Sequence, residues 1–396
     1  MKKLNDIRQS EHFELRVSPP FMWLRVRDGF PPCRFGWPET LKESYREFDS
    51  NSWQIVFRDE LQGGKRLVSG DENNVRDYTE EANALLPQEP QQLYVLETQR
   101  LIRRFGKETK SYGPFLKASP GKITAIMGGS GTGKSVFLKM LCGYDIPSAE
   151  LYSGGREMPV SKDVVKICGE TGEDGFRHLG YVPQGDVMYP ELTTSQSLRY
   201  RMRLQFGALL SEADMEQCIR HICMELLNLK EETVSKQQIG QIDWLGKYPS
   251  GGQRRRINIA HELVLEPEVL ILDEPTSGLS SKDSEDLMDS LELLAKRKKL
   301  CIVMTIHQPS SEMFRKIDDL LLLVRGGRLA YYGRRDLALD WLRKSPPRKG
   351  EEVKESANEA ETILNMIDVD SAPERYPAMF EEFLHQNGGG PTKYNG

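Results

Sequence analysis

From about residue 93 onward, the chain alternates short apolar runs with longer stretches of mixed polarity. The apolar runs cover residues 93–96, 122–127, 269–272 and 300–306. Runs of this length are typical of buried strands, and the stretches between them carry helical patterns. Short buried strands that alternate with helices predict an α/β fold with a mainly parallel sheet.

The same patterns predict further elements. Helices are expected at residues 135–142, throughout about 195–230, and near 359–366 and 378–385. A last pair of strands is predicted at 319–324 and 329–332, because Gly326 and Gly327 supply a turn between them. The glycine-rich final residues, 388–396, are expected to be disordered.

Composition divides the chain into three parts. Residues 1–90 hold three of the five tryptophans but no chemical motif, residues 91–340 carry the alternating pattern, and residues 341–396 form a charged, partly helical extension. The first part is of unknown function. It is either a small α+β domain with a regulatory or binding role or a structural appendage, with a strand expected at 53–57 and a linker at 70–92.

Charge and hydropathy exclude some classes of protein. The 396 residues are 38% hydrophobic and 29% charged, which is typical of a globular protein with two or three units. The formal net charge of -5 does not favour binding to nucleic acid, so no direct nucleic-acid partner is expected. No apolar run reaches the roughly 18 residues that span a bilayer, and no signal peptide is apparent. We therefore expect a cytoplasmic protein.

The six cysteines lie far apart, with no CxxC pair and no Cys/His group at metal-ligand spacing. They are interpreted as reduced thiols that mostly fill the core. Cys218, His221 and Cys223 are close in sequence, but they fall on an amphipathic helix and are expected to pack rather than to bind a metal.

A glycine-rich segment between a predicted strand and a predicted helix fits the P-loop pattern G-x-x-x-x-G-K-[ST]. With the next residue, Val136, the expected nucleotide-binding set is Gly128, Gly129, Ser130, Gly131, Thr132, Gly133, Lys134 and Ser135. The glycines let successive backbone N–H groups face a phosphate, and the helix directs its positive end at the anion. Lys134 is expected to reach the β- and γ-phosphates, and Ser135 to offer its hydroxyl to Mg²⁺. A plain glycine-rich turn is the alternative, but it does not require the flanking strand and helix.

Two carboxylates follow the apolar run at 269–272. Asp273 suits the outer coordination shell of Mg²⁺, and Glu274 suits orientation and deprotonation of an attacking water. Many strands end in Asp-Glu, so the pair gains its meaning from the P-loop before it. Together the two motifs predict hydrolysis of a nucleotide.

A further motif lies between the P-loop and the two carboxylates, and it consists of Ser250, Gly251, Gly252 and Gln253. It resembles the signature motif of ABC ATPases. The resemblance implies that N–H groups at the start of a helix here bind the γ-phosphate held by a second subunit. The three residues that follow, Arg254 to Arg256, are interpreted as the exposed start of this helix.

Three more residues match the same family. Gln184 resembles the Q-loop glutamine, which contacts Mg²⁺ and responds to a transmembrane partner. His307 resembles the switch histidine, which lies against the γ-phosphate. Phe105 lies 23 residues before Gly128, where the family carries an aromatic that stacks on adenine, although a phenylalanine of the core is the alternative.

Within the ABC superfamily, residues 93–370 are similar to the G subfamily of exporters, the pigment, lipid and multidrug group. The similarity rests on the segments at 273–279, 305–314 and 320–333, with a weaker echo at 358–364. Three features depart from the family. Pro249 replaces Leu or Val before the signature, Ser280 replaces the Asp of the D-loop that couples two sites, and no membrane domain follows residue 390. The last feature implies a separate permease chain or a truncated sequence.

The resemblance implies an ABC cassette with a mainly parallel core, an antiparallel β subdomain and a helical signature subdomain. It implies an ATPase that binds ATP and Mg²⁺ and closes head to tail with a second copy or a homologous ABC subunit. Such a subunit drives a transmembrane permease, here an exporter, from the cytoplasmic face of the membrane. The alternative is a soluble ABC ATPase that acts on a nucleic-acid, ribosomal or defence complex. A non-hydrolysing regulatory module would lack Glu274, Lys134 or His307, and all three are present.

Overall fold

The computed structural model describes residues 94–98, 101–105, 109–145, 149–151, 157–158, 165–206, 210–240, 248–343 and 356–367, together with four short N-terminal strands. Those strands are β1 (Phe13–Ser18), β2 (Phe21–Val26), β3 (Val68–Ser69) and β4 (Arg76–Asp77). The expectations for residues 53–57, 378–385 and 388–396, and for most of 70–92, lie outside the described residues. The chain separates into two compact units, one of residues 1–94 with 188–266 and one of residues 95–187 with 267–396.

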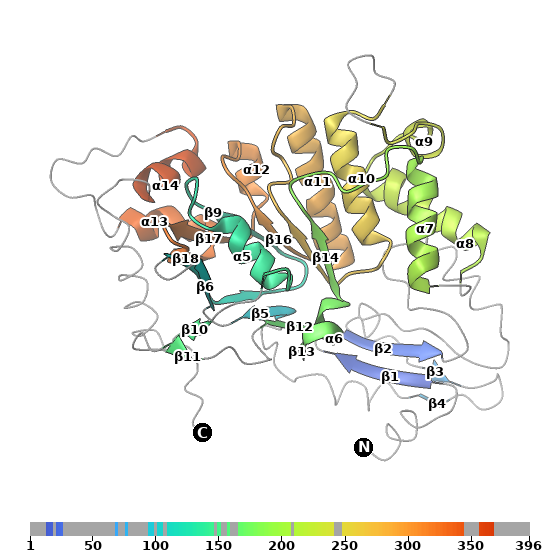
Figure 1. The fold of residues 1–396 in the computed structure, drawn as a ribbon, viewed down its shortest axis with the longest axis horizontal. Coiled ribbons are helices and arrows are strands. Elements are labelled where there is room, and N and C mark those ends of the chain that lie inside the picture. The colour runs from blue at the N-terminus through green and yellow to red at the C-terminus, as the bar shows by residue number, and fades with distance from the viewer. Residues whose placement is uncertain are drawn as a thin grey trace. The chain divides into compact units, whose positions relative to one another are not determined.

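A six-stranded sheet forms the centre of the second unit (Figure 1). Its order is β14 (Leu179–Val182), β15 (Val269–Leu272), β16 (Cys301–Thr305), β9 (Ile123–Met127), β17 (Asp319–Val324) and β18 (Arg328–Arg334). The first five strands are parallel, and β18 returns antiparallel to β17. Every residue of β9, β15 and β16 is buried, as expected of strands that are covered on both faces.

Helices surround this sheet within the same unit. They are α5 (Lys134–Leu141), α6 (Gly172–Phe176), α11 (Ser281–Lys298), α12 (Ser311–Arg315), a 3-10 turn η3 (Arg335–Leu337), α13 (Ala338–Arg343) and α14 (Glu359–Ile367). Helix α11 packs on β9 and β16 through an apolar stripe that includes Leu287, Leu291 and Leu294. Helix α14 packs against α12 and α13.

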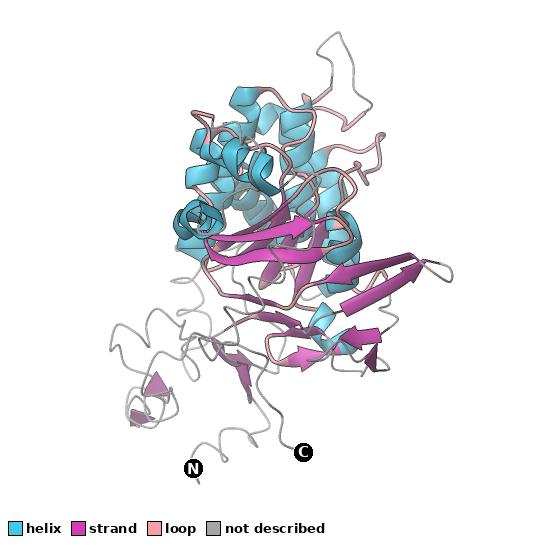
Figure 2. Cartoon of the chain, turned by 90° about the vertical axis from the view of Figure 1, so that its left-hand side faces the viewer, coloured by secondary structure: helices cyan, strands magenta, loops and turns pink. Residues whose placement is uncertain are grey.

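Two smaller antiparallel sheets complete the second unit, and they are drawn among the magenta strands of Figure 2. One consists of β11 (Glu157–Met158), β10 (Ala149–Leu151), β6 (Leu101–Phe105) and β7 (Thr109–Gly113). The other consists of β13 (Glu170–Thr171), β12 (Val165–Ile167), β5 (Leu96–Thr98) and β8 (Leu116–Ala118).

Helices make up the described part of the first unit beyond β4. They are α7 (Thr194–Phe206), α8 (Glu212–Arg220) continued by a π-helix η2 (His221–Leu226), α9 (Glu231–Ser235) and α10 (Gly251–Leu263). Buried Cys218 and Cys223 lie on α8 and η2, which confirms the prediction that they fill the core. Burial raises the pKa of both thiols, so they stay protonated.

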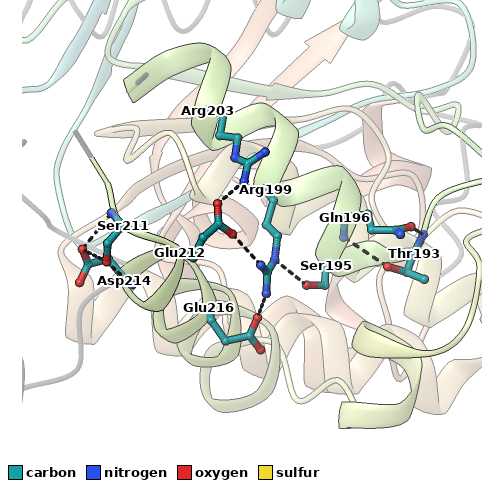
Figure 3. A network of polar contacts seen from close by, with 9 residues as sticks. All are labelled: Thr193, Ser195, Gln196, Arg199, Arg203, Ser211, Glu212, Asp214 and Glu216. Atoms are coloured by element: carbon teal, nitrogen blue, oxygen red, sulfur yellow. Dashed lines mark hydrogen bonds and ion pairs between the residues drawn. The ribbon is translucent and has the colours of Figure 1, made fainter. Parts of the chain in front are cut away.

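Ion pairs connect α7 to α8 in this unit (Figure 3). Arg199 donates to Glu212 Oε2 at 2.9 Å and also pairs with Glu216, while Arg203 pairs with Glu212. Ser211 caps α8 in a reciprocal capping box with Asp214. Because these side chains are 31–56% exposed, each pair contributes little to stability.

The predicted fold class is confirmed, with a mainly parallel sheet, antiparallel sheets and helices. The bounds of the strand predicted at 93–96 are wrong, because β5 begins at Leu96 and ends at Thr98. Val95 still donates its backbone N–H to Ala118 and is buried, which explains its apolar side chain. No helix among the described residues is long and apolar enough to cross a membrane.

Candidate nucleotide site

The P-loop connects β9 to α5, at the carboxyl edge of the parallel sheet. Gly128 has a φ of 156°, and a Cβ there would collide with the carbonyl oxygen of Leu323. Gly133 is the N-cap of α5 with a left-handed φ of 98°, and no side chain caps the helix. Glycine is therefore required at both positions. The first turn of α5 presents N–H groups that can donate hydrogen bonds to an anion.

The remaining P-loop residues take the positions that the motif predicts. Ser130 and Gly131 are exposed at the tip of the loop, and the Thr132 hydroxyl donates to Gly129 O at 3.0 Å. Lys134 is 7% exposed, and its Nζ donates to Gly128 O and Gly129 O, each at 2.9 Å. The ammonium group is thereby held against the inner side of the loop, where a bound phosphate would lie.

Asp273 connects the P-loop helix to the centre of the sheet. The Ser135 hydroxyl donates to Asp273 Oδ1 at 3.1 Å, and the Thr305 hydroxyl donates to the same oxygen at 2.7 Å. Asp273 is 4% exposed and Thr305 is fully buried. The two lie where adjacent parallel strands β15 and β16 end, so the topology itself brings them together. The Ser135 hydroxyl and the Asp273 carboxylate are oxygen ligands of the kind that Mg²⁺ prefers.

Glu274 stands in an unusual backbone conformation. Its φ is 45°, a left-handed value that costs energy in a residue with a side chain. Its N–H donates to Thr305 Oγ1 at 2.8 Å, and its Oε2 accepts from Gln184 Nε2 at 3.0 Å. These two contacts hold the carboxylate beside Gln184, two residues beyond the end of β14.

Thr305 was missed by the sequence analysis as a member of this site. One hydroxyl accepts from the Glu274 backbone and donates to the Asp273 carboxylate, so it fixes both acidic residues. The only sequence signal is its place at the end of a buried strand, directly before the segment of His307. A threonine in such a strand is usually explained by β-propensity alone.

Tyr181 lies on β14, three residues before Gln184, and its hydroxyl has a shifted pKa. Burial raises the pKa of Tyr181 above its usual range, and the negative charge of Asp273 adds to the effect. The ring of Tyr144, just beyond α5, lies 5.2 Å from the Tyr181 ring between centroids. The phenol therefore stays neutral and supports the site by packing.

His307 lies two residues beyond β16 with an exposed side chain. Its loop is anchored from the C-terminal extension, because Asn358 Nδ2 donates to Pro309 O at 2.8 Å. Asn358 Oδ1 also accepts from Ala360 N at 3.1 Å, at the start of α14. Asn358 is thus a second residue to which the sequence analysis gave no role. Phe105 is the last residue of β6, and its side chain lies outside the described residues.

The signature segment forms the start of α10 in the other unit. Ser250 is the N-cap: its hydroxyl accepts from Gln253 N at 3.3 Å, and its own N–H donates to Gln253 Oε1 at 2.8 Å. Ser250 and Gly251 are exposed, whereas Gly252 is buried. The helix therefore starts with a complete capping box, formed by its own side chains.

The prediction that Arg254 to Arg256 form an exposed helix start is wrong, because all three side chains are buried. Arg254 NH1 donates to Ile239 O at 2.7 Å and also to Gly240 O, and Arg256 NH1 donates to Asn228 O at 3.4 Å. The planar guanidinium groups satisfy backbone carbonyls of the preceding segments. The sequence pattern indicated an exposed helix start because the carbonyl acceptors of Arg254 and Arg256 lie in earlier segments of the chain.

Comparison with known proteins finds similarity over the part of the chain that holds the P-loop and the two acidic residues. Residues 114–277 match the family described as ABC transporter. Similar curated proteins of Arabidopsis thaliana are the putative white-brown complex homolog protein 30, 36% identical over 220 residues, and ABC transporter G family member 23, 30% identical over 259 residues. These alignments cover 55% and 64% of this chain. The chain spans about a fifth of the length of the first relative, 19%, and 38% of the second.

Among solved structures, the fold is similar to that of cbiO1 from Clostridium perfringens, part of the ABC transporter complex cbiONQ. The TM-score is 0.50 at 22% identity, and the match covers 65% of this chain and 96% of that chain. At this identity the likeness concerns the fold.

Proposed function

Because the chain contains an ATP-binding cassette of the ABC transporter family, related to G family members, we propose that it binds ATP with Mg²⁺ and hydrolyses it as half of a head-to-tail pair of cassettes. The observation that supports this most strongly is the convergence of Ser135, Asp273, Thr305, Glu274 and Gln184 through four hydrogen bonds of 2.7–3.1 Å. In the sequence, the first and last of these residues, Ser135 and Thr305, are 170 positions apart.

The P-loop holds the phosphates in this proposal. The N–H groups from Gly129 to Val136 surround the β-phosphate, and Lys134 exchanges its carbonyl partners for phosphate oxygens. Ser135, Gln184 and Asp273 would hold Mg²⁺, and the cation would supply positive charge to the β- and γ-phosphates. Phe105 stacks on the adenine.

Glu274 orients and activates the attacking water. Its carboxylate accepts a proton from the attacking water and aligns that water with the γ-phosphate. Gln184, which is hydrogen-bonded to Glu274, would contact both the attacking water and the Mg²⁺ ion. His307 donates to the γ-phosphate and stabilises the charge that develops on it, together with Lys134.

A second cassette completes the site. Ser250, Gly251, Gly252 and Gln253 of the partner cap the γ-phosphate, because the start of their helix supplies N–H groups and a positive dipole end. The partner is a second copy or a homologous ABC subunit. Closure of the pair does work on a transmembrane permease, most simply an exporter, with this chain peripheral on the cytoplasmic face of the membrane and without direct contact to nucleic acid.

The division of the chain follows the same proposal. Residues 91–340 form the cassette, residues 1–90 an N-terminal region, and residues 341–396 a C-terminal extension. The packing of α14 on α12 and the bond from Asn358 to Pro309 support a role for the extension in holding the His307 loop.

Two variants test hydrolysis by the proposed residues. Glu274→Gln should retain ATP binding but stop turnover, and it should accumulate an ATP-bound pair of doubled mass in light scattering. Lys134→Ala should lose nucleotide binding. Glu292→Gln, on α11 and away from the site, is the matched control and should behave as wild type. Unchanged turnover in Glu274→Gln would disprove the assignment.

The transport partner is tested separately. Tagged chain is recovered from gently solubilised membranes of its host, and the ATPase rate of the eluate is measured. A co-purifying polytopic protein that stimulates hydrolysis supports the permease. Hydrolysis with ribosomal or other soluble partners alone contradicts it.

A further inference from the structure

Three potential metal ligands meet in the second unit, away from the P-loop. Cys168 lies between β12 and β13, His178 directly before β14, and Glu268 directly before β15. One ligand atom of each lies within 4.8 Å of the others. Cys168 Sγ is 2.8 Å from Glu268 Oε2, and His178 Nδ1 is 3.5 Å from Glu268 Oε1.

The backbone holds these residues firmly. Glu268 N and Val269 N both donate to His178 O, at 2.8 and 3.0 Å. Cys168 N donates to Val95 O at 2.8 Å, and Cys168 itself has a left-handed φ of 53° in a tight turn with Gly169. His178 and Glu268 therefore stand at strand ends and Cys168 in a tight turn between two paired strands, so the backbone positions all three ligands, as a metal site requires.

The donor set matches one type of cation. Thiolate, imidazole and carboxylate together suit Zn²⁺, with bonds of about 2.0–2.3 Å to these ligands. In a tetrahedral site with such bonds, neighbouring ligand atoms lie about 3.3–3.8 Å apart. His178 Nδ1 lies 3.5 Å from Glu268 Oε1, within this range, whereas Cys168 Sγ lies 2.8 Å from the other carboxylate oxygen, Oε2. Both ligands therefore face the Glu268 carboxylate, and one shared cation requires a shift of the side chains on the order of 1 Å.

The other nitrogen of the imidazole provides an independent observation. His178 Nε2 lies 3.3 Å from Glu170 Oε2. A histidine that binds a metal through one nitrogen usually donates its other N–H to a carboxylate, which fixes the ring and strengthens the ligand. With Nδ1 toward Glu268 and Cys168, and Nε2 toward Glu170, the ring has this orientation.

Burial makes a bound cation favourable. Cys168 and Glu268 are each 2% exposed, and the His178 side chain is 16% exposed. A buried carboxylate is costly unless it is paired, and a divalent cation would neutralise it together with a thiolate.

We propose that Cys168, His178 and Glu268 bind one divalent cation of the zinc type, with Glu170 as the outer partner of His178. The cation would join the turn after β12 to the starts of β14 and β15. Those two strands lead, at their other ends, to Gln184 and Asp273, so the cation would stabilise the strands on which the candidate nucleotide site stands. This proposal does not depend on ATP hydrolysis.

Cobalt titration of the metal-free full chain tests the proposal. Co²⁺ reports a thiolate ligand through a sulfur-to-metal charge-transfer band in the near ultraviolet, and Zn²⁺ added afterwards should displace it. We expect one equivalent of Co²⁺, the band present in wild type and absent in Cys168→Ser. Cys142→Ser, another buried thiol near the end of α5, is the matched control and should keep the band.

Further variants separate the metal from a cluster held by hydrogen bonds alone. Glu268→Gln should abolish stoichiometric binding, and Glu170→Gln should weaken it about 10- to 100-fold. Zn²⁺ should raise the Tm of wild type but not that of Cys168→Ser. A cooperative thermal transition of Cys168→Ser without metal shows that this variant is folded. No stoichiometric Co²⁺ band in wild type, or a band that persists in Cys168→Ser, would overturn the proposal.

Discussion

Two helices of this protein begin with glycine-rich segments, and they begin in opposite ways. Helix α5 has a glycine N-cap and no side-chain cap, and Lys134 bends back onto the loop that precedes it. Helix α10 has a serine N-cap and a complete capping box with Gln253. One helix start is arranged to receive an anion at once. At the start of α10, the side chains of Ser250 and Gln253 already bind backbone N–H groups, and they do so until an anion held by another molecule approaches.

We propose that the two helix starts differ because one belongs to a site present in each subunit and the other to a site that forms only on closure. In our account the start of α5 binds ATP in a single subunit, and the start of α10 acts only when it meets the γ-phosphate of a partner.

The first prediction compares a glycine from each segment. Gly128→Ala should abolish ATP binding and destabilise the fold by several kcal/mol, on the order of 3, because the new Cβ collides with Leu323 O at an unfavourable φ. Gly251→Ala, at an exposed position, should leave ATP binding by the single subunit unchanged and lower only hydrolysis. Isothermal titration with ATP and chemical unfolding measure both. Equal ATP affinity in the two variants would contradict the contrast.

The second prediction concerns acid. Burial lowers the pKa of His261 on α10 to about 4, and the charge of Arg201 adds to the effect. The unfolded chain then binds more protons than the folded one between pH 6.5 and 4. The contribution of His261 to the free energy of unfolding is therefore fully present above pH 6.5. It is lost as the pH falls from 6.5 to 4, by up to roughly 3 kcal/mol.

A variant identifies the residue responsible. His261→Gln should remove this part of the pH dependence in denaturant unfolding, whereas His307→Gln, at an exposed histidine, should retain it. The same slope in wild type and His261→Gln would assign the acid sensitivity elsewhere.

The third prediction tests the connection between the two acidic residues of the site. Thr305→Val keeps the shape but leaves a buried carboxylate and the Glu274 N–H without their shared hydroxyl. We expect stability to fall by about 1–3 kcal/mol and kcat by roughly tenfold or more, with ATP affinity much less affected. Thr305→Ser restores the hydroxyl and should recover most of kcat. An unaltered kcat in Thr305→Val would remove Thr305 from the site.

The fourth prediction uses two serines that cap helices in the same manner. Ser250→Ala and Ser211→Ala should each cost about 1 kcal/mol of stability, because each breaks a capping box. Only Ser250→Ala should also lower hydrolysis, while ATP binding by the single subunit stays as it was. Matched losses of hydrolysis in both variants would mean that the cap of α10 has a structural role alone.

The sequence predicted the elements that carry strong local signals. The buried runs at 269–272 and 319–324 became β15 and β17 with the expected bounds, and the P-loop stands between a strand and a helix as its pattern requires. What the sequence did not predict depends on contacts between distant segments. The acceptors of Arg254, the hydroxyl bridge of Thr305 and the meeting of Cys168 with Glu268, 100 residues apart, follow from topology and not from spacing.

The most direct test of the central claim is complementation between two inactive variants. Lys134→Ala removes the phosphate-binding lysine, and Ser250→Arg blocks the start of α10, so each should show background ATP hydrolysis alone. An equal mixture should recover about a quarter of the wild-type rate, because about half of the pairs are mixed and each mixed pair has one intact site. A mixture that stays at background, or full activity of Ser250→Arg by itself, would contradict a site shared between two copies of this chain.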